Sequence, residues 1–362
     1  MIEDMIKRIF VYIYILCLCV LTACVYHYNE PEMPAAVLEN EYQRFSEFFL
    51  DVFDTVTIVS GYAKTQEEFD YFSKEVIRAE LHRLHQLFDI FNEYPEINNM
   101  RTINNNAGIL PVEVDPVIIE MLKLCIEAYH MTNGVVNIAL GPVIDLWRKP
   151  MALGAEPAVP DMSILLAANK LTNIHDVIID EEKNTVFLRY EGMLLDVGSI
   201  AKGFAVELAA QKAIDAGFDS FILTVGGDVR VASAPRSGAR DTWGVGIESP
   251  IAAGEMIDAV FVTDTSVFSS GDFQRYFIVD GVRYHHIIDP RTLMPAVNYR
   301  SVAVIYPDGG MADVLSTAAF ILDIDEAKDI LANFGAEAIW VLQDGDIKAT
   351  DGFNKIRIDS IK

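Results

Sequence analysis

The stretch from Leu194 to Asp228, LLDVGSIAKGFAVELAAQKAIDAGFDSFILTVGGD, carries the clearest structural pattern in the chain. Its first apolar run predicts a short buried strand over Leu194–Val197. From Ala201 the apolar residues recur on one helical face, and Gly217 is suited to end that helix because glycine adopts the left-handed conformation without a Cβ penalty. A second apolar run, Ser220–Val225, predicts another strand. The stretch therefore predicts a strand, a turn, a helix and a strand.

The turn from Gly198 to Gly203 is the part of this unit with chemical interest. A strand that turns through glycines into a helix directs unpaired backbone N–H groups and the positive end of the helix dipole at one spot. Lys202 adds a charge there, and Asp196 precedes the turn. The sequence is neither a P-loop nor a dinucleotide fingerprint. By itself the turn fits a phosphate site and an ordinary strand–helix connection with a solvated lysine equally well.

Length and composition describe a globular, acidic protein. The chain has 362 residues, of which 51% are hydrophobic, and its formal net charge is −25. Such a chain can bury a large core in one or two domains. The negative charge argues against binding to nucleic acid and against electrostatic attraction to anionic lipid.

The N-terminus predicts export. Lys7 and Arg8 precede an apolar run that ends in Leu21-Thr22-Ala23-Cys24, which resembles a bacterial lipobox. We therefore expect residues 1–23 to be a lipoprotein signal peptide, with a lipid on Cys24 that attaches the protein to the cell membrane, or inner membrane, facing outside the cytoplasm. The alternative is an uncleaved membrane anchor, since the run is only a little shorter than a spanning helix.

The mature chain is expected to begin with a tether. Residues 24–45 contain Pro31 and Pro34 among polar residues and predict a flexible linker. Residues 46–362 are expected to form the folded domain. Cys125 is the remaining cysteine outside the leader and Cys24, so a disulfide framework is not expected. Helices and strands are interspersed without regular alternation, which favours an α+β fold with mixed sheets flanked by helices.

Two further segments contain candidate chemistry. In Tyr284-His285-His286-Ile287-Ile288-Asp289, a strand pattern places His286 and Ile288 on one face and His285 on the other. Asp313 and Thr317 are four residues apart in a predicted helix, so they share a face and present two hard oxygen ligands of the kind that Mg²⁺ accepts. From these residues alone the simpler interpretation is favoured, that Asp313 suits the start of a helix without any metal.

Together these segments resemble the FAD:protein FMN transferases, the ApbE-type flavin transferases. The resemblance extends from about Phe53 to Leu322 and rests on short motifs that occur in family order. They are Asp196-x-Gly198-x-x-Ala201-Lys202-Gly203, Gly226-Gly227, Ser270-Gly271-Asp272, His286-x-Ile288-Asp289-Pro290 and Ala312-Asp313-x-x-Ser316-Thr317. The chain departs from the family at Phe53-Asp54-Thr55, where Met-Gly-Thr is common, and at Asn137, where aspartate is common.

The resemblance implies an ApbE-like architecture, FAD as substrate and Mg²⁺ as cofactor. FMN would be transferred to a threonine or serine hydroxyl of an acceptor flavoprotein subunit outside the cytoplasm, and AMP would leave. By position, Mg²⁺ would be held by Asp313, Thr317 and the main-chain oxygen of Ser199. His286 would be the catalytic base, with Lys202 beside the pyrophosphate. The flavin contacts implied by the resemblance are Phe53, Phe91, Val135, Val136, Asn137, Asp196, Lys202 and Ile288.

Two rival functions fit the same residues. In an FAD pyrophosphatase, water would replace the acceptor hydroxyl at the same metal site. In a flavin-binding lipoprotein, FAD would bind without turnover. Release of AMP from FAD, with and without an acceptor, distinguishes the three.

Overall fold

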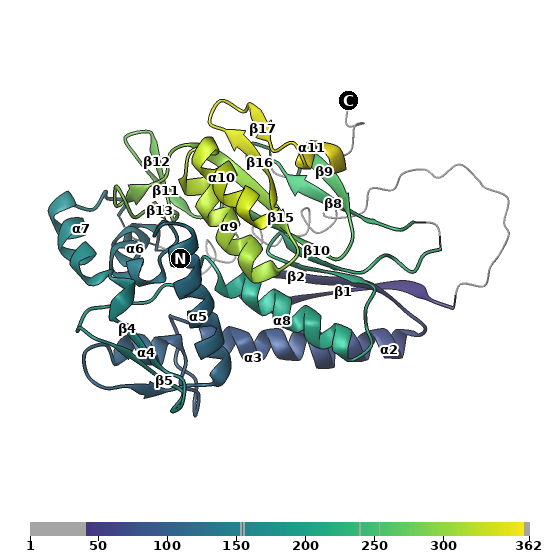
Figure 1. The fold of residues 1–362 in the computed structure, drawn as a ribbon, viewed down its shortest axis with the longest axis horizontal. Helices are drawn as coiled ribbons and strands as arrows, with labels where there is room; N and C mark the ends of the chain where they lie inside the picture. The colour runs from purple at the N-terminus through teal and green to yellow at the C-terminus, as the bar shows by residue number, and fades with distance from the viewer. Residues whose placement is uncertain (1–40, 153, 155, 239, 253, 358–362) are drawn as a thin grey trace, which may run out of the picture.

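The structure is a computed structural model that describes residues 41–152, 154, 156–238, 240–252 and 254–357 (Figure 1). The predicted signal peptide, Cys24 and most of the predicted tether lie outside the described residues. Within the described ranges, no helix is both long and apolar enough to cross a membrane.

An eight-stranded sheet forms the centre of the molecule, in the spatial order β1-β2-β6-β7-β10-β15-β16-β17. Each pair of neighbours in it is antiparallel. Its strands are β1 (Gln43–Val52), β2 (Thr55–Ala63), β6 (Phe221–Val225), β7 (Asp228–Ala232), β10 (Thr265–Gly271), β15 (Tyr299–Tyr306), β16 (Glu337–Leu342) and β17 (Ile347–Ala349). The predicted α+β class is confirmed.

Helices cover one face of this sheet. α9 packs against β10, β15 and α8, and α8 in turn packs against a long helix near the N-terminus. The main apolar core lies between these helices and the sheet, and Phe221, Phe268 and Phe320 are fully buried in it. The helices of this layer are α2 (Gln66–Asp70), its continuation as a π-helix (Tyr71–Arg78), α3 (Ala79–Phe88), α8 (Ala201–Asp215), α9 (Gly309–Ile321) and α10 (Ile324–Phe334).

The other face carries a second, smaller core. The hairpin of β8 (Trp243–Glu248) and β9 (Met256–Val262) packs there with α11 (Phe353–Ile356). Trp243, Val260 and Phe353 are buried in this core together with residues of β7, β10, β15 and β16. The central sheet therefore separates two apolar layers.

The remaining elements gather beside the helical layer, at the left of Figure 1. Buried residues from the ranges 140–165 and 277–293 build a third core around Trp147, which is fully buried, whereas those from 100–128 and 177–188 contribute to the main core. The helices are α4 (Met100–Asn105), α5 (Pro116–Met131), α6 (Gly141–Arg148) and α7 (Met162–Ala168), with 3₁₀ turns at Ile138–Leu140, Lys149–Met151, Asn169–Leu171 and Ile174–Asp176. The strands are β3 (Val112–Glu113), β4 (Val177–Asp180), β5 (Thr185–Leu188), β11 (Tyr276–Val279), β12 (Val282–His285), β13 (Ile288–Asp289) and β14 (Met294–Pro295).

The structure corrects one part of the opening stretch. The predicted strand over Leu194–Val197 is not formed, because its polar backbone groups find other partners. The side-chain amide of Asn104 bonds both the N–H and the carbonyl of Leu195, and the N–H of Asp196 donates to the Ile138 carbonyl. An extended segment satisfied in this way needs no sheet neighbour.

The rest of the stretch is confirmed. The helix is α8, and Gly217 follows its end with φ +100°. The second strand is β6, which continues directly into β7 through Gly226 and Gly227. Both glycines have positive φ, +63° and +94°, as a two-residue hairpin turn requires. Asp228 therefore begins a strand beside the start of α8.

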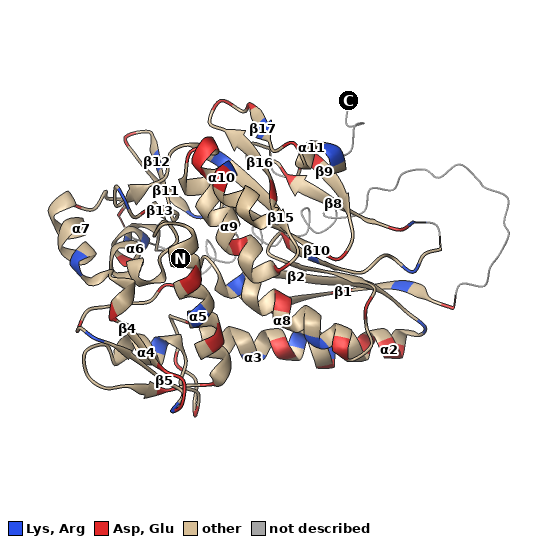
Figure 2. Cartoon of the chain, in the orientation of Figure 1, with Lys and Arg blue, Asp and Glu red and all other residues tan. Residues whose placement is uncertain are grey.

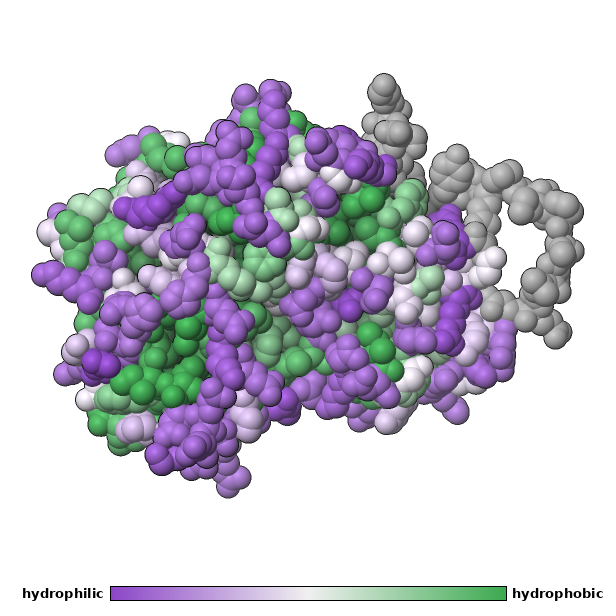
Figure 3. All heavy atoms as spheres, viewed as in Figure 1, coloured by the Kyte–Doolittle hydropathy of each residue, from purple (hydrophilic) through white to green (hydrophobic). Residues whose placement is uncertain are grey.

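Charged and apolar side chains are distributed over the surface. Figure 2 shows Asp and Glu interspersed with Lys and Arg along α3 and α8, whereas the charged residues of α2 are all acidic. In the same view, Figure 3 shows much of this face covered by hydrophilic residues, with apolar residues gathered over the region of α4 and α5.

Candidate active site

The first turn of α8 packs directly on α9 at two glycines. A Cβ on Gly203 would lie 2.3 Å from the carbonyl oxygen of Gly309 and 2.6 Å from Cβ of Asp313. A Cβ on Gly309 would lie 3.1 Å from the carbonyl oxygen of Gly203. Only glycine at position 203 permits this approach, because the obstructing atom is backbone and has no room to move. The close approach places Asp313 over the N-terminus of α8.

Asp313 satisfies one of the free N–H groups in the first turn of α8. Gly203 is the third residue of α8, so its N–H has no acceptor within the helix. It donates instead to Oδ2 of Asp313 at 2.9 Å. Asp313 is also not the helix cap, since Asp308 fills that position by accepting from the N–H of Met311. The helix-start interpretation of Asp313 is therefore wrong.

The carboxylate of Asp313 is buried, with 6% of the residue exposed. Burial raises its pKa to about 7; Lys202 opposes the shift and Asp228 adds to it. A carboxylate buried in this way is stabilised in its charged form by a cation placed against it. Asp313 therefore has the electrostatic character expected of a residue that faces a metal ion.

Thr317 lies one turn further along α9 and is partly buried. Its hydroxyl is 3.4 Å from that of Ser270, which in turn lies 2.9 Å from the hydroxyl of Ser316. Ser270 sits in β10, so the Ser-Gly-Asp motif supports the face of α9 that carries Thr317. The sequence pattern predicted the shared face of Asp313 and Thr317, and α9 confirms it.

These residues fit a magnesium ion by their chemistry. A carboxylate, a hydroxyl and a backbone carbonyl are hard oxygen donors, and Mg²⁺ commonly keeps several of its positions for water and substrate phosphates. Among the described residues, no group of three or more His, Cys, Asp or Glu side chains could hold a metal ion. A single carboxylate with two neutral oxygens is therefore the type of site that depends on the phosphates of its substrate.

Lys202 forms an ion pair with Asp228, the first residue of β7. Burial opposes the lysine charge, but the carboxylates of Asp228 and Asp313 outweigh it and raise the pKa of Lys202. Oδ1 of Asp228 also accepts from the N–H of Ser269 at 2.8 Å. Lys202 is thus held charged between two acidic residues. The sequence analysis missed Asp228, although its place directly after two glycines was the available signal.

The two adjacent histidines have different environments. His285 is 3% exposed; its Nε2–H donates to the Ala296 carbonyl at 2.6 Å, and its Nδ1 accepts from the N–H of Ile287 at 3.2 Å. Both of its nitrogens are therefore used within the fold. His286 is partly buried. Among the described residues only its Nδ1 has a hydrogen-bond partner, the carbonyl oxygen of Arg275 at 3.3 Å.

The partner of His286 determines which nitrogen carries the proton. A carbonyl oxygen only accepts, so Nδ1 is protonated and Nε2 keeps a free lone pair. Burial, with His285 and Arg275 nearby, lowers the pKa of His286 to about 4. The ring is therefore neutral near pH 7 and has the form that a general base requires.

Two arginines hold the loop between β10 and β11. The predicted strand through both histidines is interrupted, because β12 ends at His285 and His286 lies outside any strand. Asp272, 3% exposed, accepts from Nη1 of Arg283 at 3.1 Å, and Nε of Arg300 lies 3.2 Å from the same oxygen. The last residue of the Ser-Gly-Asp motif therefore anchors the loop between β10 and β11, and its side chain belongs to an ion-pair network within the fold.

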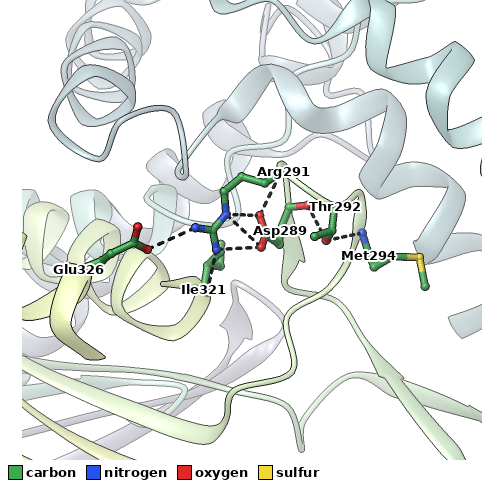
Figure 4. A network of polar contacts seen from close by, with 6 residues as sticks. All are labelled: Asp289, Arg291, Thr292, Met294, Ile321 and Glu326. Carbon is green, nitrogen blue, oxygen red and sulfur yellow. Dashed lines mark hydrogen bonds and ion pairs between the residues drawn. The ribbon is translucent and has the colours of Figure 1, made fainter. Parts of the chain in front are cut away.

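A second network joins the segment after His286 to α9, as Figure 4 shows. Arg291 donates to both oxygens of Asp289 at 3.0 and 2.9 Å and reaches the Ile321 carbonyl at the end of α9. It also pairs with Glu326 of α10 at 3.3 Å. The Asp-Pro-Arg motif therefore connects the candidate base to α9, although Asp289 and Arg291 do not themselves lie in the Lys202–Asp313 cluster.

Phe53 occupies a turn that few residues adopt. Phe53 and Asp54 both have φ +51° in the connection between β1 and β2. Glycine adopts this left-handed conformation without strain, and aspartate tolerates it better than most residues. The N–H of Phe53 donates to Nδ1 of His85 at 3.2 Å, and the two rings meet edge to face. Phe53 is therefore held at the surface end of the sheet.

Phe91 and Asp196, both predicted flavin contacts, are brought together by a residue that the sequence analysis did not single out. Phe91 is 54% exposed. The guanidinium of Arg148 lies 5.0 Å from the centre of its ring and forms an ion pair with Asp196. No motif marked Arg148, because its role depends on contacts between segments distant in the sequence.

The other predicted flavin contacts are more enclosed. Val135, Val136 and Ile288 are 5%, 3% and 4% exposed, and their side chains pack in the apolar cores. Asn137 accepts from the N–H of Ala139 and donates to the Thr172 carbonyl. Contact of these four residues with a flavin stays a prediction.

A polar cavity of about 370 Å³ adjoins Asn137. Asn137 is the one predicted site residue in its lining, and it lies apart from the Lys202–Asp313 cluster. Its lining residues are Tyr129, Asn133, Gly134, Asn137, Asn169, Thr172, Asn173, Pro290 and Arg291.

Comparison with known sequences assigns these motifs to one family. The chain matches the sequence model of the ApbE family over residues 53–340. It is 34% identical to an FAD:protein FMN transferase of Treponema pallidum over 279 residues, which cover 72% of this chain and 75% of that protein. It is 31% identical to an FAD:protein FMN transferase of Klebsiella pneumoniae over 273 residues, which cover 73% and 83%.

Solved structures agree with this assignment. The ApbE protein of Thermotoga maritima matches with a TM-score of 0.76 at 29% identity, covering 88% of this chain and 100% of that one. The flavin transferase ApbE of Vibrio cholerae matches with a TM-score of 0.71 at 22% identity, covering 87% and 99%, and so shares the fold. The family match includes Lys202, His286 and Asp313. The chain belongs to the ApbE family.

Proposed function

We propose that this protein is a Mg²⁺-dependent FAD:protein FMN transferase that attaches FMN to a serine or threonine hydroxyl of another protein and releases AMP. One observation carries the proposal: Lys202, Asp313 and the Gly198–Gly203 turn converge at the N-terminus of α8. Backbone N–H groups, a lysine held in its charged form and a buried carboxylate are suited together to a metal-bound pyrophosphate. The names of the relatives support the same reaction.

The metal would be held by Asp313, Thr317 and the Ser199 carbonyl. When bound, Mg²⁺ supplies charge that stabilises the phosphate oxygens during displacement. Lys202 would neutralise further charge on the same pyrophosphate, and its pairing with Asp228 limits the orientations of the ammonium group. The N–H of Gly203 fixes one carboxylate oxygen of Asp313, so that the other faces the ligand.

His286 would act on the acceptor. Its unprotonated Nε2 takes the proton of the acceptor hydroxyl, and the hydroxyl oxygen attacks the phosphorus of the FMN half. A new P–O bond forms to the acceptor while the P–O bond to the bridging oxygen breaks. AMP leaves with that oxygen, and the proton on His286 passes to solvent.

The pyrophosphatase and the non-catalytic flavin binder remain the alternatives, and one incubation decides between the three. Purified protein is incubated with FAD and MgCl₂, alone and with exported proteins of the source cell. The transferase releases AMP and leaves a protein with the added mass of FMN on a serine or threonine. Release of AMP with free FMN alone would identify a pyrophosphatase, and bound FAD without AMP would identify a binding protein. Asp313→Asn is the matched inactive control.

We also propose that the protein acts outside the cytoplasm, attached to the membrane by a lipid on Cys24. The support is the sequence Leu21-Thr22-Ala23-Cys24 after a short apolar run. The acceptor protein would then also lie outside the cytoplasm.

A further inference from the structure

Arg148, the last residue of α6, lies between two residues expected to contact the flavin. Its guanidinium forms an ion pair with Asp196 and stacks over the ring of Phe91 at 5.0 Å. Phe91 and Asp196 are 105 positions apart in the chain, and the Arg148 side chain contacts both. Besides its ion pair, the Arg148 guanidinium therefore has a cation–π contact with an aromatic ring.

The position of Arg148 is fixed by its neighbour. Trp147 is fully buried, and its Nε1–H donates to the Leu293 carbonyl at 2.9 Å. Its ring stacks on Phe277 and Tyr284 of the β11–β12 hairpin, which leads into His286. Arg148 therefore extends from a helix end anchored to the same hairpin as the candidate base.

Its two partners are fixed as well. Asp89 accepts from the N–H groups of Phe91 and Asn92 at 2.6 and 3.0 Å, which shapes the loop that carries the Phe91 ring. Oδ1 of Asp196 accepts from the N–H of Gly198 at 3.0 Å. The three groups thus form a preorganised corner: an aromatic face, a carboxylate and a guanidinium.

The corner has a specific recognition chemistry. A guanidinium has five N–H donors, more than Asp196 uses, and a carboxylate accepts several hydrogen bonds. A donor beside an acceptor matches a planar ring whose edge has a carbonyl next to an N–H. The pyrimidine edge of the isoalloxazine ring has this pattern.

We propose that Arg148 binds the pyrimidine edge of the flavin and sets the affinity for the FMN half of FAD. This inference rests on the proposed function in taking FAD as the ligand. Arg148 donates to a ring carbonyl, Asp196 accepts from the neighbouring ring N–H, and Phe91 holds the guanidinium in place through its ring face. Lysine does not substitute, because it lacks the planar fork that serves Asp196 and the ring together.

The proposal is tested by measuring the affinities of FAD and of its two halves separately. Dissociation constants for FAD, FMN and AMP are measured for the full-length protein and for Arg148→Gln, Arg148→Lys and Lys149→Gln, in the presence of MgCl₂. Lys149→Gln is the matched control, since it removes the adjacent charge, and Lys149 is paired with Asp145 at the surface. Thermal melting of each variant without ligand verifies folding.

We expect Arg148→Gln and Arg148→Lys to weaken FMN and FAD at least about tenfold, the scale of one charge-assisted hydrogen bond. AMP affinity and the Lys149→Gln variant should stay within about twofold of wild type. The absorption band of bound FMN should also shift in Arg148→Gln, because a cation beside a ring carbonyl polarises the flavin.

Unchanged FMN affinity would overturn the proposal, and so would an equal loss for FMN and AMP or a loss for AMP alone. These constants do not require turnover. If wild type binds FMN through Arg148 yet releases no AMP from FAD, the proposed function fails and the assignment of Arg148 stands.

Discussion

The N–H of Gly203 and the carboxylate of Asp313 are joined by a hydrogen bond of 2.9 Å that crosses from α8 to α9. The bond satisfies a first-turn N–H that has no acceptor within α8, and the close approach that allows it requires glycine at position 203. It links the turn expected to face a pyrophosphate with the residue expected to hold the metal, so the two halves of the candidate site depend on one backbone contact.

Replacing Gly203 by alanine should therefore damage both stability and magnesium use. The new Cβ would meet the Gly309 carbonyl at 2.3 Å, which forces the two helices apart. We expect a loss of about 1–3 kcal/mol in the free energy of unfolding, the usual cost of overpacking, and a weaker Mg²⁺ dependence of AMP release. Gly244→Ala is the control, because its Cβ would meet only the Phe261 ring at 3.4 Å. Equal melting temperatures for both variants would contradict the packing argument.

Asp313→Asn should abolish Mg²⁺-dependent AMP release while flavin binding persists. The amide keeps the shape but lacks the charge that a hard dication requires. Thr317→Val should be milder, since water can replace a neutral hydroxyl ligand. Activity is measured across a magnesium titration, with the surface variant Asp325→Asn as control. Full activity of Asp313→Asn at limiting magnesium would mean that the metal site lies elsewhere.

His286→Ala should bind FAD almost normally and transfer FMN roughly 10²-fold more slowly, the scale of a lost general base. His285→Ala should act differently, because His285 is buried with both nitrogens bonded in the fold. Its main effect should be a lower melting temperature. The two variants are compared by single-turnover transfer at saturating FAD and by thermal unfolding. If His285→Ala folds well and loses more activity than His286→Ala, then His286 is not the base.

The lowered pKa of His286 predicts the acid side of the pH profile. With a folded-state pKa of about 4 against 6.5 for the ordinary ring, His286 stays neutral well below pH 6.5. Protonation of this base should therefore not be what limits transfer in mildly acidic buffers. Between pH 6.5 and 4 the unfolded chain binds a proton at this position that the folded chain does not, so this residue makes stability fall as the pH falls. His286→Gln should reduce that slope in denaturant melts, and an unchanged slope would contradict the lowered pKa.

Cys24→Ala tests the proposed lipid attachment to the membrane. If Cys24 carries the lipid, the variant should leave the membrane fraction while FAD cleavage per molecule remains unchanged. Fractionation and mass spectrometry of the mature N-terminus provide the measurement. An unprocessed chain that stays in the membrane for both the variant and the wild type would indicate a membrane anchor in place of a lipoprotein signal.

The sequence by itself determined the features that depend on local periodicity. The helical faces of α8 and α9 follow from their apolar spacing, which also places Asp313 and Thr317 one turn apart. Gly217 and the glycine pair at 226 and 227 mark turns where positive φ is required. Short ordered motifs were enough to indicate the ApbE family, because such motifs keep residue types as well as spacing.

Tertiary structure decided what depends on distant partners. The apolar run at Leu194–Val197 has the composition of a strand, yet Asn104, some ninety residues earlier, satisfies its backbone. Val135, Val136 and Ile288 turned out to be core residues, and no pattern marked Asp228 or Arg148. Ion pairs such as Lys202 with Asp228, and Arg148 with Asp196, form across segments that only the folded chain brings together. Local spacing carries no information about such contacts, because they depend on how helices and strands pack.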